Sequence, residues 1–477
     1  MSTIIYAILS FTFIVPSIIC KNATPKIAVV GGGIGGTSCA YFLNKIFEGK
    51  AQLTLYEKDI IGGRLGLLNI DGDLYESGGS VIHPTNKHMM DFTKLLGLSL
   101  RKPPASHFGI FDGKEFVFRE SDWYFLTLGK FLWRYGFAFL DLWKEVKSIL
   151  EDFNSIYALQ EKGYSFTTVN GLLEYMSPSF RNLTQESIGS YLMKKGYPKL
   201  LLEELVQSVM MVNYGQTNNM SAFAGFVSLA GADNNLWCVK GGNKMVPEGL
   251  LKESKASVVS GDVLEIINSG GTFSLKYNET SPPGNTEEQN YDIIVIAAPF
   301  IKGNKNIKFT DFNKDFSQYE TIYHRTVATF VKGDLNPSAF NVNSVPEEIL
   351  TFKNSLLFNS IGKVTPVTDT PTKGKKQVYK VFSQQPLTPK NIDELFQNVE
   401  ILKEKDWLAY PEYNPPESLS PFMLYPGLYY INSVELSASA MEMSAVAGKN
   451  VALLAFNMWH NLMDKVDSHK RVYKDEL

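Results

Sequence analysis

The feature that most constrains the fold is a glycine-rich run near the N-terminus. Residues 27–36 read IAVVGGGIGG, an apolar stretch followed by Gly31, Gly33 and Gly36 in the spacing G-x-G-x-x-G. The apolar part predicts a buried parallel strand, and the residues after the glycines predict a helix. The first glycine of this motif permits a tight turn, the second lets backbone amides approach a pyrophosphate, and the third lets the helix pack closely on the sheet. The run therefore predicts a strand–turn–helix unit that binds a dinucleotide.

An acidic residue completes this nucleotide signature. A second apolar run, LTLYE, ends at Glu57, where a carboxylate accepts hydrogen bonds from a ribose diol and repels a phosphate on that ribose. The nucleotide is therefore expected to be FAD or NAD, not NADP. A second glycine pair with an arginine follows at Gly62, Gly63 and Arg64. This arrangement resembles that of flavin amine oxidases and their relatives, in which it contacts the FAD phosphates, so we expect FAD.

Length and composition indicate an ordinary globular protein with more than one domain. The chain has 477 residues, of which 44% are hydrophobic and 20% charged, and its net charge is −3. The sequence has no basic run to neutralise phosphates, which argues against a nucleic-acid partner. Its three cysteines and six scattered histidines have no metal-ligand spacing. Neither a disulfide framework nor a metal site is therefore expected.

Both ends of the chain carry targeting signals. Residues 1–20 are almost wholly apolar and predict a cleaved signal peptide, with a retained anchor as the alternative. The last four residues, Lys474 to Leu477, read KDEL, the signal by which a receptor returns proteins to the endoplasmic reticulum. We therefore expect an endoplasmic reticulum lumen location and a KDEL-type receptor as partner. Glycosylation sequons fit the same compartment and begin at Asn22, Asn182, Asn219 and Asn278.

The fold class expected is α/β, with a Rossmann-type FAD-binding domain built from discontinuous segments. Residues 26–90, 236–300 and 421–465 form this domain, and residues 91–235 and 301–420 form an interleaved α+β substrate domain. Residues 258–267, VVSGDVLEII, alternate like a pair of strands. The predicted cofactor contacts all lie in the FAD-binding segments: Gly31, Gly33, Gly35, Gly36, Glu57, Gly62, Gly63, Arg64, Val263, Ala298, Glu435 and Met441.

The last FAD-binding segment predicts a strand followed by a helix. The helix is expected from about Ser439, with Ser437, Ser439 and Glu442 placed to cap its N-terminus. Its free backbone amides would then form a second site aimed at the cofactor.

One aromatic segment of the first insert stands out. Residues 123–143, WYFLTLGKFLWRYGFAFLDLW, are apolar on nearly all helical faces. The favoured interpretation is a buried helix or helical hairpin. A peripheral membrane contact and the wall of an apolar pocket are the alternatives.

Several motifs past residue 205 resemble one family closely. They are VNYGQ at 212–216, LWCVKGGN at 236–243, YHRTVATFV at 323–331 and AMEMS at 440–444. Together they look like prenylcysteine oxidase, also called farnesylcysteine lyase, over nearly the whole mature chain. The resemblance implies FAD, O2 and the thioether of farnesyl- or geranylgeranyl-cysteine as substrate, in the degradation of prenylated proteins. The implied products are a prenyl aldehyde, cysteine and hydrogen peroxide.

In such a reaction the cofactor carries the difficult step, so the sequence assigns no catalytic side chain firmly. Tyr214 and His324 are the weak candidates. The alternative functions are another flavin amine-oxidase-type oxidase and a flavin-binding protein that carries prenyl lipid without turnover. Animal members of the family are usually associated with lysosomes, which makes the lysosome the alternative compartment.

Overall fold

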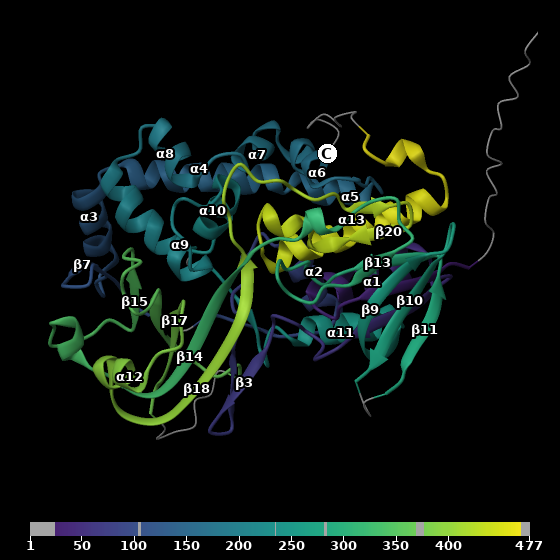
Figure 1. Ribbon diagram of the computed structural model, residues 1–477. Helices are drawn as coiled ribbons and strands as arrows, with labels where there is room; N and C mark the ends of the chain where they lie inside the picture. The colour runs from purple at the N-terminus through teal and green to yellow at the C-terminus, as the bar shows by residue number, and fades with distance from the viewer. Residues whose placement is uncertain (1–23, 104–105, 234, 281–283, 369–375, 469–477) are drawn as a thin grey trace, which may run out of the picture.

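The computed structural model describes residues 24–468, except for 104–105, 234, 281–283 and 369–375. The predicted signal peptide, the KDEL tail and the sequon at Asn22 lie outside the described residues. Two large sheets and a layer of helices make up the described part, with the nine-stranded sheet towards one end and the seven-stranded sheet towards the other (Figure 1).

The nine-stranded sheet contains a parallel core with the strand order of a dinucleotide-binding fold. β1 (Lys26–Val30) lies at its centre, with Ile27 in register with Leu53 of β2 and with Ile293 of β12. The sheet order is β11-β10-β9-β2-β1-β12-β20-β19, and β13 also pairs with β9. The remaining strands have these bounds: β2 Gln52–Glu57, β9 Ser257–Asn268, β10 Phe273–Glu279, β11 Thr286–Tyr291, β12 Ile293–Ile296, β13 Lys308–Thr310, β19 Met423–Tyr425 and β20 Leu428–Tyr430.

The parallel strands are buried on both faces, which explains their continuous apolar runs. Ile27 and Val29 of β1 pack in one core cluster, together with residues of the helices α1 (Ile34–Ile46) and α13 (Met441–Trp459). Ala28 and Val30 pack in a second cluster, with residues of β10 and β12. The α/β fold with a Rossmann-type domain, predicted from the glycine run, is confirmed. The predicted strand pair at 258–267 is wrong, because β9 runs through it as one strand.

The seven-stranded sheet is built from the two inserts. Its order is β18-β14-β17-β16-β15-β6-β7. The long antiparallel pair β14 (Tyr323–Leu335) and β18 (Phe396–Pro411) forms one edge and reaches back towards the nucleotide-binding sheet (Figure 1). The other strands are β6 Phe108–Phe111, β7 Phe116–Arg119, β15 Glu348–Thr351, β16 Ser360–Val364 and β17 Val378–Ser383.

Helices of the first insert form a layer beside these sheets (Figure 1). They are α3 Tyr124–Tyr135, α4 Ala138–Phe153, α5 Ser155–Glu161, α6 Val169–Met176, α7 Pro178–Leu183, α8 Ile188–Lys194, a π-helix Leu201–Val206, α9 Gln207–Tyr214 and α10 Ala222–Ala230. The other elements include α2 Lys87–Leu95, α11 Met245–Ser254, α12 Pro389–Leu395, the pairs β3–β4 (Leu67–Ile70, Asp73–Glu76) and β5–β8 (Leu100–Arg101, Cys238–Val239), and a 3-10 helix Ile431–Leu436. Among the described residues, no helix is both long and apolar enough to cross a membrane.

The aromatic segment 123–143 differs from its favoured interpretation. It forms the predicted helical hairpin, α3 and α4, but many of its large side chains face solvent, with Trp133 and Phe125 the most exposed. The prediction of a buried hairpin is therefore wrong. Apolar side chains lie on most faces of these two helices, but other elements of the fold pack against only some of those faces.

Candidate flavin site

The turn after β1 is made possible by two glycines. Gly31 has φ +113° and donates its N–H to the Tyr56 carbonyl at 2.8 Å. A Cβ on Gly31 would lie 2.6 Å from the Ala297 carbonyl oxygen, and a Cβ on Gly36 would lie 1.9 Å from the Gly31 carbonyl oxygen. A side chain at either position would therefore prevent the chain from making this turn or the helix from packing on it.

Gly33 lies at the mouth of this turn and faces open space. It precedes the first residue of α1, with φ −72° and ψ −179°, and a Cβ built on it meets no atom within 4 Å. Among the described residues, no side chain caps this end of α1, and its first turn has no acidic residue. An uncapped helix N-terminus beside open space is suited to a pyrophosphate. The site therefore fits the phosphates of a dinucleotide.

The second glycine pair lies directly against the first. Gly62 donates its N–H to the Gly32 carbonyl at 2.9 Å, and Gly62 and Gly63 both have positive φ. The Glu57 carboxylate closes the other side of the turn, because its Oε2 accepts the Gly32 N–H at 2.7 Å. Residues of three separate predicted motifs therefore line one opening at the carboxyl ends of β1 and β2. Gly35, also predicted to contact the cofactor, faces Ile431 at the start of the 3-10 helix.

Arg64 is held in place by a buried carboxylate. Its guanidinium forms an ion pair with Glu435 and donates to the Ala409 carbonyl at 2.8 Å. Glu435 is fully buried and also accepts hydrogen bonds from the Tyr323 hydroxyl and the Asn432 amide, each at 2.7 Å. The Glu435 side chain, predicted to contact the cofactor, therefore positions the arginine that was predicted beside it.

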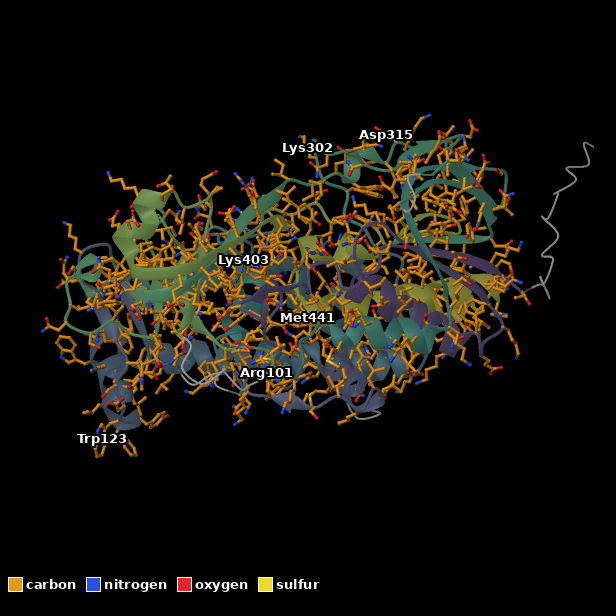
Figure 2. The ribbon with its side chains drawn as sticks, turned by 90° about the horizontal axis from the view of Figure 1, so that it is seen from below. Arg101, Trp123, Lys302, Asp315, Lys403 and Met441 are labelled. Carbon is orange, nitrogen blue, oxygen red and sulfur yellow. The ribbon has the colours of Figure 1, made fainter. Side chains whose placement is uncertain are left out.

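The other predicted contacts, Ala298, Met441 and Val263, lie in three different places. Ala298 follows the end of β12, next to the residue that the Gly31 turn approaches. Met441 is the first residue of α13 and lies near the middle of the molecule (Figure 2), with its Sδ and Cε close to Gly79. Val263 lies in β9, opposite Tyr277 of β10, and is buried in the cluster on the far face of the sheet.

The predicted capping of α13 is wrong. Ser437 donates its hydroxyl to the Val434 carbonyl at 2.6 Å, inside the preceding 3-10 helix. Glu442 instead accepts the N–H groups of His88 and Met89, at 2.8 and 3.0 Å, and thereby caps α2. α13 begins after Ala440, and none of the described side chains caps it. Its N-terminal amides therefore form a second uncapped helix end near the opening.

Three tyrosines pack beside the start of α13. The Tyr214 ring centroid lies 4.9 Å from that of Tyr410 and 5.4 Å from that of Tyr413. The Tyr214 hydroxyl donates to the Ser439 carbonyl at 2.9 Å, and the Ser439 N–H donates to the Tyr413 oxygen at 2.8 Å. Burial raises the pKa of Tyr214 and of Tyr413, so both stay neutral. These hydrogen bonds fix the backbone just before Met441.

His324 lies next to Gly215, the residue that follows Tyr214. An ideal Cβ on Gly215 would lie 2.7 Å from the His324 Nε2 atom, which places the imidazole against the end of α9. This Nε2 atom is buried and has no hydrogen-bond partner among the described residues. Burial lowers the pKa of His324, so the ring is neutral near pH 7. His324 thus lies beside the residue that follows Tyr214, and its Nε2 atom has no partner in the described part of the chain.

A buried lysine that is hydrogen-bonded to the backbone of a buried glutamate was missed by the sequence analysis. Lys380 of β17 is buried, donates its ammonium to the Glu76 carbonyl at 3.2 Å and lies 4.9 Å from the Phe382 ring centroid. Burial lowers the pKa of Lys380 to about 8 and raises that of Glu76 to about 7. Since 304 positions separate the two residues, no local spacing could have indicated the pair.

Three of the four predicted glycosylation sites fall in the described residues. Asn182 lies in α7 and Asn219 in a turn, and both are exposed. Asn278 lies in β10, where its side-chain oxygen accepts the Thr286 hydroxyl at 2.8 Å.

Comparison with solved structures supports the same architecture. A double mutant of putrescine oxidase superposes with a TM-score of 0.61 at 13% identity, covering 91% of this chain and 99% of that chain. Cyclohexylamine oxidase from Brevibacterium oxydans gives 0.59 at 15% identity, covering 92% and 100%. A fatty acid isomerase from P. acnes gives 0.60 at 14% identity, covering 89% and 97%. The chain therefore shares the fold of these three proteins.

Sequence comparison identifies the family. A family model for an NAD(P)-binding Rossmann-like domain matches residues 29–96, and one for prenylcysteine lyase matches residues 118–468. Prenylcysteine oxidase 1 of Bos taurus is 40% identical over 95% of this chain and 92% of the relative, and that of Homo sapiens is 40% identical over 93% and 91%. Prenylcysteine oxidase 1-like of Mus musculus is 37% identical over 94% of both chains. The chain thus belongs to the prenylcysteine lyase family, as its motifs predict.

Proposed function

We propose that the protein is an FAD-dependent thioether oxidase that cleaves farnesyl- or geranylgeranyl-cysteine. The observation that carries the proposal is the match to prenylcysteine oxidases over nearly the whole of both chains. The site agrees with it, because the two glycine loops and the uncapped end of α1 fit a dinucleotide. The reaction consumes the thioether, O2 and water, and yields the prenyl aldehyde, cysteine and hydrogen peroxide.

Bound FAD would supply the hydride acceptor for this oxidation. The chain itself would bind and orient the cofactor: the α1 amides beside Gly33 would hold its phosphates, and Glu57 would bind the ribose. Tyr214 and Tyr413 fix the backbone before α13 through their hydrogen bonds to Ser439.

His324 is the candidate proton acceptor. Water must lose a proton when it adds to the oxidised carbon next to sulfur, and a neutral imidazole can take it. The Nε2 atom of His324 is buried, lies beside Gly215 and lacks a partner in the described part of the chain. Its lowered pKa keeps it able to accept a proton near pH 7.

Anaerobic reduction tests the proposal directly. Purified protein carrying its flavin is mixed with farnesylcysteine without oxygen, and loss of the absorption band of oxidised flavin is expected. Unchanged absorbance would contradict turnover and favour a flavin protein that only binds prenyl lipid. Reduction by a benzylic amine, but not by farnesylcysteine, would favour an amine oxidase.

We further propose that the protein resides in the lumen of the endoplasmic reticulum. The apolar N-terminal segment, the KDEL tail and the sequons support this location, and the exposure of Asn182 and Asn219 suits glycan attachment. Deletion of residues 474–477 should release the protein from the endoplasmic reticulum in cells, as seen by immunofluorescence. Full-length protein found in lysosomes would contradict retention and support the compartment usual for animal members of the family.

A further inference from the structure

The aromatic hairpin, residues 123–143, exposes an unusual set of large apolar side chains. Several of them are more than half exposed: Trp133 88%, Phe125 80%, Phe137 73%, Trp123 71%, Tyr124 69% and Leu126 57%. Trp123 lies at an extremity of the molecule, at the projecting end of the helical layer (Figure 2). A group of exposed large apolar side chains in one short segment is typical of an interaction site.

The hairpin is held firmly by its other face. Arg134 donates two hydrogen bonds to Glu204, at 2.6 and 2.7 Å, and the Tyr135 hydroxyl donates a third at 3.1 Å. The Phe131 ring centroid lies 4.4 Å from that of Phe118 in β7. One face of α3 is therefore packed and hydrogen-bonded while the other faces solvent. The exposed face is a fixed feature of the fold, which presents its rings in a defined arrangement.

The chemistry of the exposed face fits a phospholipid surface. Tryptophan and tyrosine prefer the boundary between headgroups and acyl chains, because their rings are apolar with a polar edge. α3 contains no acidic residue, and of its two cations Arg134 is paired with Glu204, which leaves Lys130. Lys130 is exposed and its ammonium donates to the Arg119 carbonyl at 2.9 Å, a neutral partner. Its charge is complementary to a lipid phosphate, and its aliphatic stem can lie along the apolar layer.

Acidic residues near the aromatic side chains limit how deeply the hairpin could insert into a phospholipid layer. Asp122 directly precedes Trp123 and its side chain is 88% exposed, while Asp141 lies on α4 and pairs with Lys144. These carboxylates would have to stay in the hydrated headgroup layer. A shallow contact, without a spanning helix, follows from this arrangement.

We propose that the aromatic hairpin inserts into the interfacial layer of a phospholipid bilayer and anchors the protein to one leaflet. Such a contact needs only an apolar face with aromatic and basic residues, lying in the plane of the interface. A protein partner would bury comparable rings in a concave or flat surface, whereas Trp123 lies at a projecting extremity (Figure 2).

The hairpin is also connected to the candidate site. Glu204, which receives the three hydrogen bonds, lies in the π-helix Leu201–Val206, and this helix continues into α9, which ends at Tyr214. If the proposed function holds, a membrane anchor would bring the enzyme to its substrate, because a farnesyl or geranylgeranyl chain partitions into bilayers. The hairpin would hold the enzyme at the surface where such a substrate accumulates.

Depth-dependent fluorescence quenching tests the contact in the intact flavin-bound protein. The chain has six tryptophans, and three of them, Trp123, Trp133 and Trp143, lie in the hairpin. Phosphatidylcholine vesicles with brominated acyl chains should quench part of the emission, and the vesicles should carry the protein with them on sedimentation. Absence of both signals would overturn the proposal.

A triple variant, Phe125→Ser/Trp133→Ser/Phe137→Ser, should lower vesicle partitioning about tenfold or more. The matched control is Val258→Ser/Leu402→Ser/Met463→Ser, which changes three apolar residues that are about half exposed elsewhere in the structure. The control should partition like the wild type. Flavin absorbance and the melting temperature verify the fold of each variant, and Phe125→Ser alone serves if the triple variant unfolds.

Two outcomes would contradict a lipid anchor. The triple variant could partition as strongly as the wild type, or the wild type could form dimers that the same substitutions disperse, without any vesicle binding. The second result would mean that another copy of the chain covers the face. Turnover of detergent-dispersed farnesylcysteine distinguishes the anchor from the proposed function, because loss of the anchor alone leaves that turnover intact.

Discussion

At the scale of single residues, a substitution at Gly33 can test cofactor binding without disturbing the fold. Its backbone has an ordinary extended conformation, and nothing within 4 Å would meet a Cβ. Gly33→Val should therefore fold, yet its side chain would occupy the space that suits the pyrophosphate. We expect this variant to lose the flavin, as measured by the ratio of flavin to protein absorbance after gel filtration.

Gly362→Val is the control for this change. Gly362 lies in β16, far from the glycine loops in sequence, and a Cβ there also meets nothing within 4 Å. This control should keep its flavin. A Gly33→Val protein that stays fully yellow would show that the open space holds no cofactor.

The lowered pKa of Lys380 should make the free energy of unfolding depend on pH. Burial lowers its pKa in the folded state to about 8, from 10.5. Between these values the unfolded chain binds more protons than the native one, so the free energy of unfolding rises with pH across this window. Lys380→Met should lack that rise. Relative to the wild type, it should be more stable by about 1–3 kcal/mol near neutral pH, with the advantage shrinking as the pH rises.

Urea denaturation near neutral pH and in alkaline buffer measures this difference. Lys403→Met, which removes an exposed lysine from β18 of the same sheet, is the control for loss of one positive charge. A difference in unfolding free energy between Lys380→Met and the wild type that stays constant with pH would refute the expectation.

At the scale of elements, Glu442 joins two helices. It belongs to α13, yet its carboxylate accepts the His88 and Met89 N–H groups at the start of α2 and the Tyr157 hydroxyl at 2.8 Å. Glu442→Ala would leave these buried donors unsatisfied and should lower the free energy of unfolding by about 1–3 kcal/mol. Chemical denaturation of the variant and the wild type measures the loss.

Glu253→Ala serves as the control, because Glu253 is an exposed glutamate of α11. Its effect should stay within about 0.5 kcal/mol. Equal stability of the two variants would mean that Glu442 does not stabilise α2.

The elements also show which structural features can be predicted from local sequence. The strand, turn and helix at 27–36 are predictable, because the steric roles of Gly31 and Gly36 lie within one loop. The cap of α13 is not, because Ser437 bonds within its own 3-10 helix and Glu442 reaches another element. The exposure of the aromatic hairpin is not predictable either, because an apolar pattern does not indicate which helical face packs against another element.

At the scale of the whole molecule, the candidate site is assembled from distant segments. The sheet core takes β1 and β2 from the start of the chain, β9 and β12 from its middle and β20 from near its end. Arg64 and Glu435, 371 positions apart, join the first segment to the last. A ligand bound between these segments should stabilise the entire fold.

Removing the flavin should therefore lower the thermal midpoint. With free flavin at about a hundred times its dissociation constant, the stabilisation is about 2.7 kcal/mol. Calorimetry of protein with and without the cofactor measures the shift, and Gly33→Val should not respond to added FAD. Coincident midpoints for the two wild-type forms would contradict a ligand shared between the segments.

The fold class and the family were predictable at this scale, whereas the pairings between segments were not. Motifs such as residues 27–36 and 236–243 are local and specific, and the family match confirms the assignment drawn from them. The Lys380–Glu76 and Arg64–Glu435 pairs depend on how distant segments fold together. These pairings are determined by the tertiary structure, and no local or periodic sequence pattern indicates them.

The position of α13 has a consequence for synthesis on the ribosome. A Cβ on Gly448 would lie 2.5 Å from the Ser38 Oγ atom and 2.8 Å from the Gly35 carbonyl oxygen, so α13 packs directly on α1. α1 is among the first elements to emerge during translation, and α13 is the last long one. The nucleotide-binding half must therefore keep part of its apolar surface uncovered until α13 has been made. A cofactor that is held between the first and last segments can therefore be bound only after α13 has been synthesised.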